Sequence, residues 1–210
     1  MYKIVRRLGL FLTLAGTLAA LSGSMASTAI PALADGDSPP QNGSHADKVK
    51  DLMKRMRESV NETLPANAPL VPWPDDHEGS GGTAATSFST QFDPNPYGCI
   101  GQTDNPHKST HTGGTTINVI ARTKCNVSVP EIYVNTQLYK RDCGWPWCGW
   151  SPYAPDNPKT DYNKSLLQTN SASGPCVNGE YKGTSSHYII GADGNFYSAI
   201  TQNAENVTTC

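Results

Sequence analysis

The stretch TTINVIART, residues 115–123, decides the fold class of this 210-residue chain. Its apolar residues Ile117, Val119 and Ala121 alternate with polar ones. Side chains of a strand point to opposite faces in turn, so this alternation places the three apolar residues on one face. The stretch therefore predicts a β-strand with one side against a hydrophobic core.

Similar short β-rich stretches continue through the C-terminal half of the chain. Further strand candidates, separated by turn residues, occupy 131–141, 165–170, 179–183, 186–190 and 196–202. The sequence Ala-Asp-Gly-Asn at 192–195 predicts a hairpin turn before the last of them. About six to eight short strands at this spacing favour an antiparallel β-sandwich. We expect this mainly β domain to cover residues 97–210.

The N-terminus predicts an export signal. Three basic residues precede an apolar run of 14 residues, 8–21, which is short for a membrane span but has the length of a signal-peptide core. Small residues allow cleavage after Ala26 or Ala34, and the polar sequence that follows Ala34 favours the second. We therefore expect a signal peptide over 1–34, no membrane span, and a secreted, extracellular protein.

The cysteines support a small disulfide-stabilised domain. All six lie in the β-rich part: Cys99, Cys125, Cys143, Cys148, Cys176 and Cys210. An even number of cysteines in an exported protein predicts three disulfides, although six cysteines allow fifteen pairings. Nearness along the chain favours pairing each cysteine with the next one in sequence. The bridge from Cys143 to Cys148 closes so short a loop that it contributes little through loop entropy, and shaping a surface loop explains it better.

Charge separates the β-rich domain from the segment before it. Residues 35–96 hold 10 acidic and 5 basic side chains, whereas residues 97–210 hold 8 of each. Without the signal peptide the formal net charge is about -5. This balance argues against nucleic acid or anionic lipid as the partner, because both favour a basic surface. We interpret residues 35–96 as an acidic tail, flexible where proline, glycine and serine dominate.

One helix is predicted within this tail, over about residues 45–63. Ser44 can cap it, and Pro65 ends it. Its apolar residues recur at intervals of three and four: Val49, Leu52, Met53, Met56, Val60 and Leu64. A helix of this length is marginal alone in water, so its apolar face is expected to pack on something. Two interpretations are open. In one, the helix packs on its own domain or is a cleavable pro-segment. In the other, Leu52, Met56 and Val60 bind a groove of a partner protein.

A proline-rich stretch of the tail, PLVPWPDD at 69–76, holds Trp73. Flanking prolines favour an extended backbone, which lowers the entropy lost when a partner takes up the ring. Trp73 is therefore a candidate docking residue. The alternative is that it fixes the linker to the domain surface.

An aromatic loop, CGWPWCGW at 143–150, contains three of the four tryptophans. Aromatic residues on a rigid loop dominate binding energy at many interfaces. The candidate binding residues are Trp145, Trp147, Trp150 and Tyr153. They would stack on sugar rings or fill a pocket of a partner, unless one or two of the rings cover the end of the sandwich.

Catalytic patterns give little support for an enzyme. Asp104, His107 and His111 have metal-ligand chemistry, but proline and glycine around them indicate a solvated loop. His187 is interpreted as a half-buried histidine. Asp156, Asp161 and Glu180 would form an acid pair only if folding brought them together. We expect no catalytic residue, no metal and no cofactor.

Two runs carry a resemblance to a known class, NVIARTKC at 118–125 and YVNTQLY at 133–139. Together with the export signal and the disulfides, they resemble small secreted β-sandwich proteins of actinobacteria that have no assigned activity. A flexible tail before a compact sandwich is also similar to the adaptor subunits of the umbrella-shaped secreted toxin particles of Streptomyces. That resemblance implies a tail bound by a lectin subunit, a role for which the tail helix and the Trp73 stretch are the candidates.

The leading hypothesis is a secreted, non-catalytic binding or adaptor module. Its tail would engage a partner protein, and its aromatic loop would engage another partner or a glycan. The alternatives are an antimicrobial or cell-wall lectin-like effector, and a hydrolase with an unrecognised site.

Overall fold

The structure, a computed structural model, describes residues 45–74 and 95–210. The predicted signal peptide and the tail parts 35–44 and 75–94 lie outside the described residues. In chain order the elements are α1 (His45–Glu58), the 3-10 helix η1 (Ser59–Asn61), β1 (Asn67–Pro69), β2 (Val71–Pro72), β3 (Ile100–Thr103), β4 (His107–Lys108), β5 (Ile117–Gly144), β6 (Trp147–Pro152), β7 (Lys159–Ser173), β8 (Gly179–Ile190) and β9 (Phe196–Val207).

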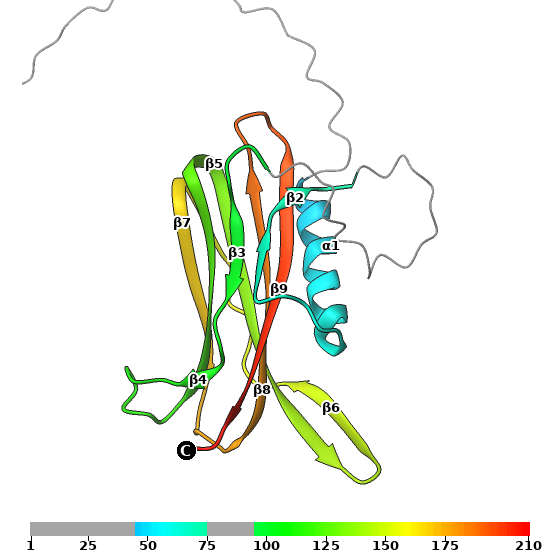
Figure 1. Ribbon diagram of the computed structural model, residues 1–210, viewed down its shortest axis with the longest axis vertical. Coiled ribbons are helices and arrows are strands. Elements are labelled where there is room, and N and C mark those ends of the chain that lie inside the picture. The colour runs from blue at the N-terminus through cyan, green and yellow to red at the C-terminus, as the bar shows by residue number, and fades with distance from the viewer. Residues whose placement is uncertain (1–44, 75–94) are drawn as a thin grey trace, which may run out of the picture. The chain divides into compact units, whose positions relative to one another are not determined.

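The strands of the described residues form one antiparallel sheet. Its main path is β1-β3-β5-β8-β9-β2, and β4, β6 and β7 also pair with β5 (Figure 1). β5 is thus the central strand, with β3 and β4 beside its first half and β8 and β6 beside its second half. The prediction of a mainly β, antiparallel fold is confirmed. The stretches 115–123 and 131–141, predicted as two strands, fall largely within this single element.

β5 folds back on itself midway along its length. The Oγ1 hydroxyl of Thr123 donates a hydrogen bond of 2.7 Å to the carbonyl oxygen of Tyr133, whereas ten residues of straight strand would span about 33 Å. Ile117 and Leu138 likewise share one core cluster. The pairing of β7 with β5 shifts register in the same region, and Figure 1 shows β5 turning there.

This turn changes the predicted architecture. Because β5 and β7 both continue past it, the two layers belong to one sheet that wraps around its core. β3 and β1 also contact β9, on the other layer. The arrangement is therefore close to a barrel, and the expected sandwich of two separate sheets is corrected to a single wrapped sheet.

α1 packs its apolar face on β8 and β9 (Figure 1). Leu52 is 2% exposed and Met56 is 0% exposed. They share a core cluster with three stacked or adjacent aromatic rings, those of Tyr133, Tyr188 and Phe196. The α-helix ends at Glu58, before the predicted end near residue 63. One 3-10 turn, η1, follows it before the chain becomes extended.

Residues 64–72 complete the same fold. β1 pairs with β3, and β2 pairs with β9. The side-chain oxygen of Gln202 accepts a hydrogen bond from the backbone N–H of Leu64, and its amide nitrogen donates to the carbonyl of Ser59. Residues 45–74 are therefore built into the domain, which corresponds to the interpretation in which the predicted helix packs on its own domain.

The three disulfides join Cys99 to Cys125, Cys143 to Cys148, and Cys176 to Cys210. These are the pairs expected from nearness along the chain. The first bridge is buried in a core cluster, whereas both cysteines of the second are exposed. Among the described residues, no helix is long and apolar enough to cross a membrane.

Candidate binding site

The aromatic loop is a β-hairpin formed by the end of β5 and the start of β6. Cys143 lies opposite Cys148, and Gly144 lies opposite Trp147, so Trp145 and Pro146 form a two-residue turn. Residues that face each other across an antiparallel pair share a face, and neighbours along a strand alternate. The disulfide therefore lies on one face of the hairpin and Trp147 on the other.

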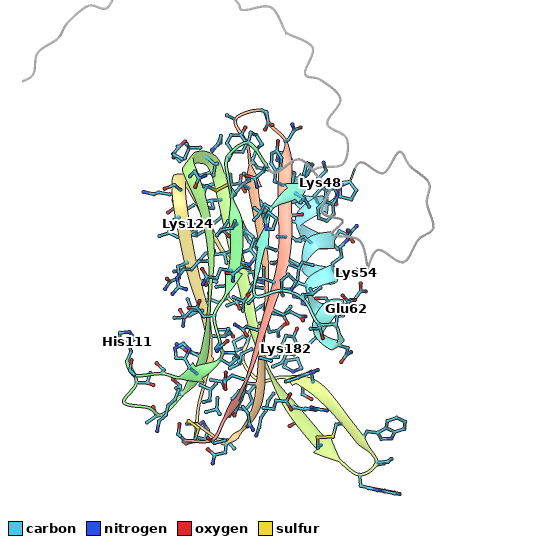
Figure 2. The ribbon with its side chains drawn as sticks, in the orientation of Figure 1. Lys48, Lys54, Glu62, His111, Lys124 and Lys182 are labelled. Atoms are coloured by element: carbon cyan, nitrogen blue, oxygen red, sulfur yellow. A yellow bond between two sulfur atoms is a disulfide. The ribbon has the colours of Figure 1, made fainter. Side chains whose placement is uncertain are left out.

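Both tryptophans near the tip are free of the domain. Trp145 is 99% exposed and Trp147 is 80% exposed. Within the described part of the chain, neither indole takes part in a ring contact or a cation–π contact of the kind that holds the other two tryptophans. In Figure 2 the hairpin with its disulfide projects beyond the rest of the sheet. The tip thus presents two large apolar rings to the surroundings.

The base of the hairpin is fixed to the domain through Lys182 and Trp150. The Lys182 ammonium lies 4.8 Å from the centre of the Trp150 ring and donates hydrogen bonds to the carbonyls of Val60 and Glu62, at 2.9 and 3.1 Å. Burial lowers the pKa of Lys182, an effect that the nearby Glu180 carboxylate opposes. Lys182 therefore connects the end of η1 to β6 (Figure 2).

Tyr153 holds the other side of the base. Its hydroxyl donates to the carbonyl of Pro175 at 2.9 Å, and its ring packs edge-on against Tyr181. Arg141 forms an ion pair of 2.8 Å with Glu180. Of the four residues predicted in this loop to bind a partner, Trp150 and Tyr153 are thus half-buried and serve to position Trp145 and Trp147.

Trp73 is held against the domain rather than presented as a free docking residue. Its ring packs edge-on against Phe196 at 5.4 Å, and the Arg55 guanidinium lies 4.6 Å from the ring centre. The backbone N–H of Trp73 also donates to the carbonyl of Phe196. The alternative interpretation, in which Trp73 fixes this segment to the surface, describes its place in the structure.

The three helix residues proposed for a partner groove are covered as well. Leu52, Met56 and Val60 are all buried within the domain. An apolar side chain that already packs in a core is not available to a second protein unless the helix detaches. The structure therefore does not present these residues on its surface.

The candidate metal-ligating residues do not converge. Asp104 forms an ion pair of 2.6 Å with Arg122, His107 donates through Nδ1 to the carbonyl of Asn105, and His111 lies in the exposed loop before β5 (Figure 2). In residues 45–74 and 95–210, no group of three or more His, Cys, Asp or Glu side chains is arranged to hold a metal ion.

The three acidic residues considered for an acid pair each have a partner of their own. Asp156 pairs with Arg57, Glu180 pairs with Arg141, and the carboxylate of Asp161 accepts from the next backbone N–H. Each acid therefore has its own local role in the structure.

His187 is fully buried, not half-buried as expected. Nδ1 of His187 lies 3.0 Å from the hydroxyl oxygen of Thr123, and Nε2 lies 2.8 Å from the hydroxyl oxygen of Thr201, so both ring nitrogens have a hydrogen-bond partner. Burial lowers the pKa of His187 to about 3. The imidazole is therefore neutral at ordinary pH.

Two features near the tip were not singled out in the sequence. Gly144 and Gly149 flank the disulfide, and a Cβ built on either would meet nothing within 4 Å in the described part of the chain. The sequence could have indicated these glycines through the alternation of side chains in a hairpin. If Cys143 pairs with Cys148, then Gly144, Trp147 and Gly149 lie on one face of that hairpin.

Three exposed apolar side chains also lie in the stretches of β5 and β7 around the register shift. Val127, Tyr162 and Leu166 are each more than half exposed. Figure 1 places the turn of β5 and β7 at the end of the sheet away from β6.

Comparisons with protein-family models, with curated proteins and with solved structures found no match to this chain.

Proposed function

We propose that this chain is a secreted binding module that engages a partner through Trp145 and Trp147. The observation that carries the proposal is the near-complete exposure of both indoles at the tip of a disulfide-closed hairpin. Soluble proteins rarely leave large apolar side chains grouped in this way without a binding role. The predicted signal peptide and the three disulfides support export to an oxidising compartment.

The tip offers enough apolar surface to matter for affinity. Two tryptophan side chains carry roughly 400 Å². At about 25 cal/mol per Å² this corresponds to about 10 kcal/mol of gross transfer free energy, before the costs of association are subtracted. The disulfide and the fixed base reduce one of those costs, because a rigid hairpin loses little freedom on binding.

An adaptor also needs a second surface. The exposed side chains of Val127, Tyr162 and Leu166 supply one, in the stretches of β5 and β7 around the register shift. In the described part of the chain β7 pairs with β5 alone. Residues 155–157 bond to residues 169–171 of β7, so the part of its other edge that can take a partner strand lies before Thr169. This surface takes the place of the helix residues that were expected to engage a partner and are buried.

The test compares two double variants of residues 35–210. Trp145→Ala with Trp147→Ala removes the tip, while Ile100→Ala with Val177→Ala removes exposed apolar surface elsewhere. Each is immobilised and exposed to the secreted proteins of the producing culture, to insoluble cell wall and to a glycan array.

We expect the tryptophan variant to lose a ligand that the control variant and the unchanged chain retain. Its melting temperature should remain unchanged, because both indoles are exposed. Equal retention by all three proteins would refute the proposal.

A further inference from the structure

The two glycines beside Trp147 have no explanation within the part of the chain that the structure describes. Neither Gly144 nor Gly149 has the positive φ that favours glycine, and a Cβ on either would meet no atom of residues 45–74 and 95–210 within 4 Å. Elsewhere in the same sheet the reverse holds, since a Cβ on Gly183 would lie 2.3 Å from a methyl group of Val119. The hairpin glycines are therefore not needed for packing or backbone conformation.

Glycine at these positions has a cost. It weakens a strand by roughly 0.5 to 1 kcal/mol relative to alanine, through the entropy of the unfolded chain. In strands it often marks a place where a ligand or another backbone approaches closely. Gly144, Trp147 and Gly149 share one face, so the backbone around the Trp147 indole is bare.

We propose, building on the binding function above, that the hairpin tip inserts into a narrow apolar pocket of a partner protein whose wall packs against Gly144 and Gly149. The indoles of Trp145 and Trp147 fill the pocket. The glycines let its rim approach the hairpin backbone, which a side chain at either position would prevent.

The chemistry of the tip favours a protein pocket over a sugar. No side chain between Gly144 and Gly149 carries a polar group apart from the indole N–H. A glycan site needs several polar groups to bond the hydroxyls of the sugar, in addition to an aromatic ring. A projecting tip also cannot enclose a sugar ring, whereas it fits a concave surface.

The area that a stable interface buries also favours insertion into a protein pocket. Stable interfaces bury about 800 Å² on each partner, about twice the roughly 400 Å² of the two indoles. Insertion of the tip into a pocket supplies the missing area, because it also buries both flanks of the hairpin.

A lipid surface differs from a protein pocket because it is fluid, so it would accommodate additional methyl groups on the hairpin.

Valine substitutions distinguish these partners. Gly144→Val and Gly149→Val add a side chain that strands favour, and Asn170→Val, on the exposed side of β7, is the matched control. The probes are the secreted proteins of the producing culture, phosphatidylcholine vesicles with and without phosphatidylglycerol, and insoluble peptidoglycan. Circular dichroism and melting temperature confirm that each variant folds.

We expect each glycine variant to weaken retention of a protein ligand at least tenfold, as strongly as Trp147→Ala, while Asn170→Val leaves it unchanged. If the tryptophan variant loses the ligand and the glycine variants keep it, the pocket is refuted and the binding function stands. Retention by vesicles or peptidoglycan that the valines leave unchanged or strengthen also overturns the pocket. If the tryptophan variant loses nothing, both proposals fail.

Discussion

Replacing Leu52 with alanine is expected to lower the free energy of unfolding by about 3 kcal/mol. The side chain is 2% exposed and packs with Met56, Tyr188 and Phe196. Its removal leaves a cavity between α1 and the sheet, and such a cavity costs more than the lost transfer free energy alone. Urea denaturation of residues 35–210 measures the change.

Lys50→Ala is the control for this prediction. Lys50 is exposed on the same helix, so its replacement should change stability by less than about 0.5 kcal/mol. If Leu52→Ala were as mild as Lys50→Ala, α1 would not be part of the folded domain. The interpretation of the helix as a free, partner-binding tail would then regain support.

Acidification is expected to destabilise the domain through His187. Burial holds the pKa of its imidazole at about 3 in the folded state, against about 6.5 in an unfolded chain. As the pH falls, the unfolded state takes up a proton first, so the stability that the neutral imidazole gives is complete above pH 6.5 and is lost toward pH 3. The loss approaches about 1.4 kcal/mol per pH unit below pH 6 and amounts to about 2 kcal/mol between pH 6.5 and 4.5.

His187→Gln separates this effect from the titration of carboxylates. Among the described carboxyl groups, Asp193 has a shifted pKa: burial raises it, and hydrogen bonds from Tyr197 and Asn195 more than reverse this, leaving it below its ordinary value of 3.8. The stability that the Asp193 carboxylate contributes is lost below pH 4.5, outside the pH range of this comparison. We expect the glutamine variant to be less stable at pH 7 but nearly independent of pH between 6.5 and 4.5. Parallel curves for the two proteins would contradict the assignment.

Much of the fold follows from local sequence patterns. The alternation of Ile117, Val119 and Ala121 identified a strand with a buried face, and all three side chains are fully buried. The turn at 192–195 joins β8 to β9 as expected. Nearness along the chain also predicted the three disulfide pairs, because each bridge joins a cysteine to the next cysteine in the sequence.

The wrapping of the sheet could not be predicted in this way. Alternation on both sides of residues 125–128 is the same whether β5 runs straight or turns back. The turn depends on partners far along the chain, namely β7 on both halves and β8 on the second half. The face of α1 was equally ambiguous, since an amphipathic helix shows which side is apolar but not which surface covers it. Here the cover comes from Tyr188 and Phe196, more than a hundred residues away.

The aromatic loop shows the same limit at the level of single residues. Composition grouped Trp145, Trp147 and Trp150 together, yet the pairing of Cys143 with Cys148 puts Trp147 and Trp150 on opposite faces. Trp150 then meets Lys182, whose position depends on β8. The division between binding and positioning residues therefore depends on tertiary contacts.

The central claim, that Trp145 and Trp147 meet the partner while Trp73 and Trp150 hold the domain together, is tested most directly by fluorine NMR. Residues 35–210 labelled with 5-fluorotryptophan should give four resonances, assigned by single Trp→Phe variants. In the free protein, exchange of H₂O for D₂O should shift the two tip resonances most, because those rings are the most exposed. On addition of the retained ligand, the account predicts that these two resonances shift or broaden while those of Trp73 and Trp150 stay in place. Changes confined to Trp73 or Trp150 would contradict it.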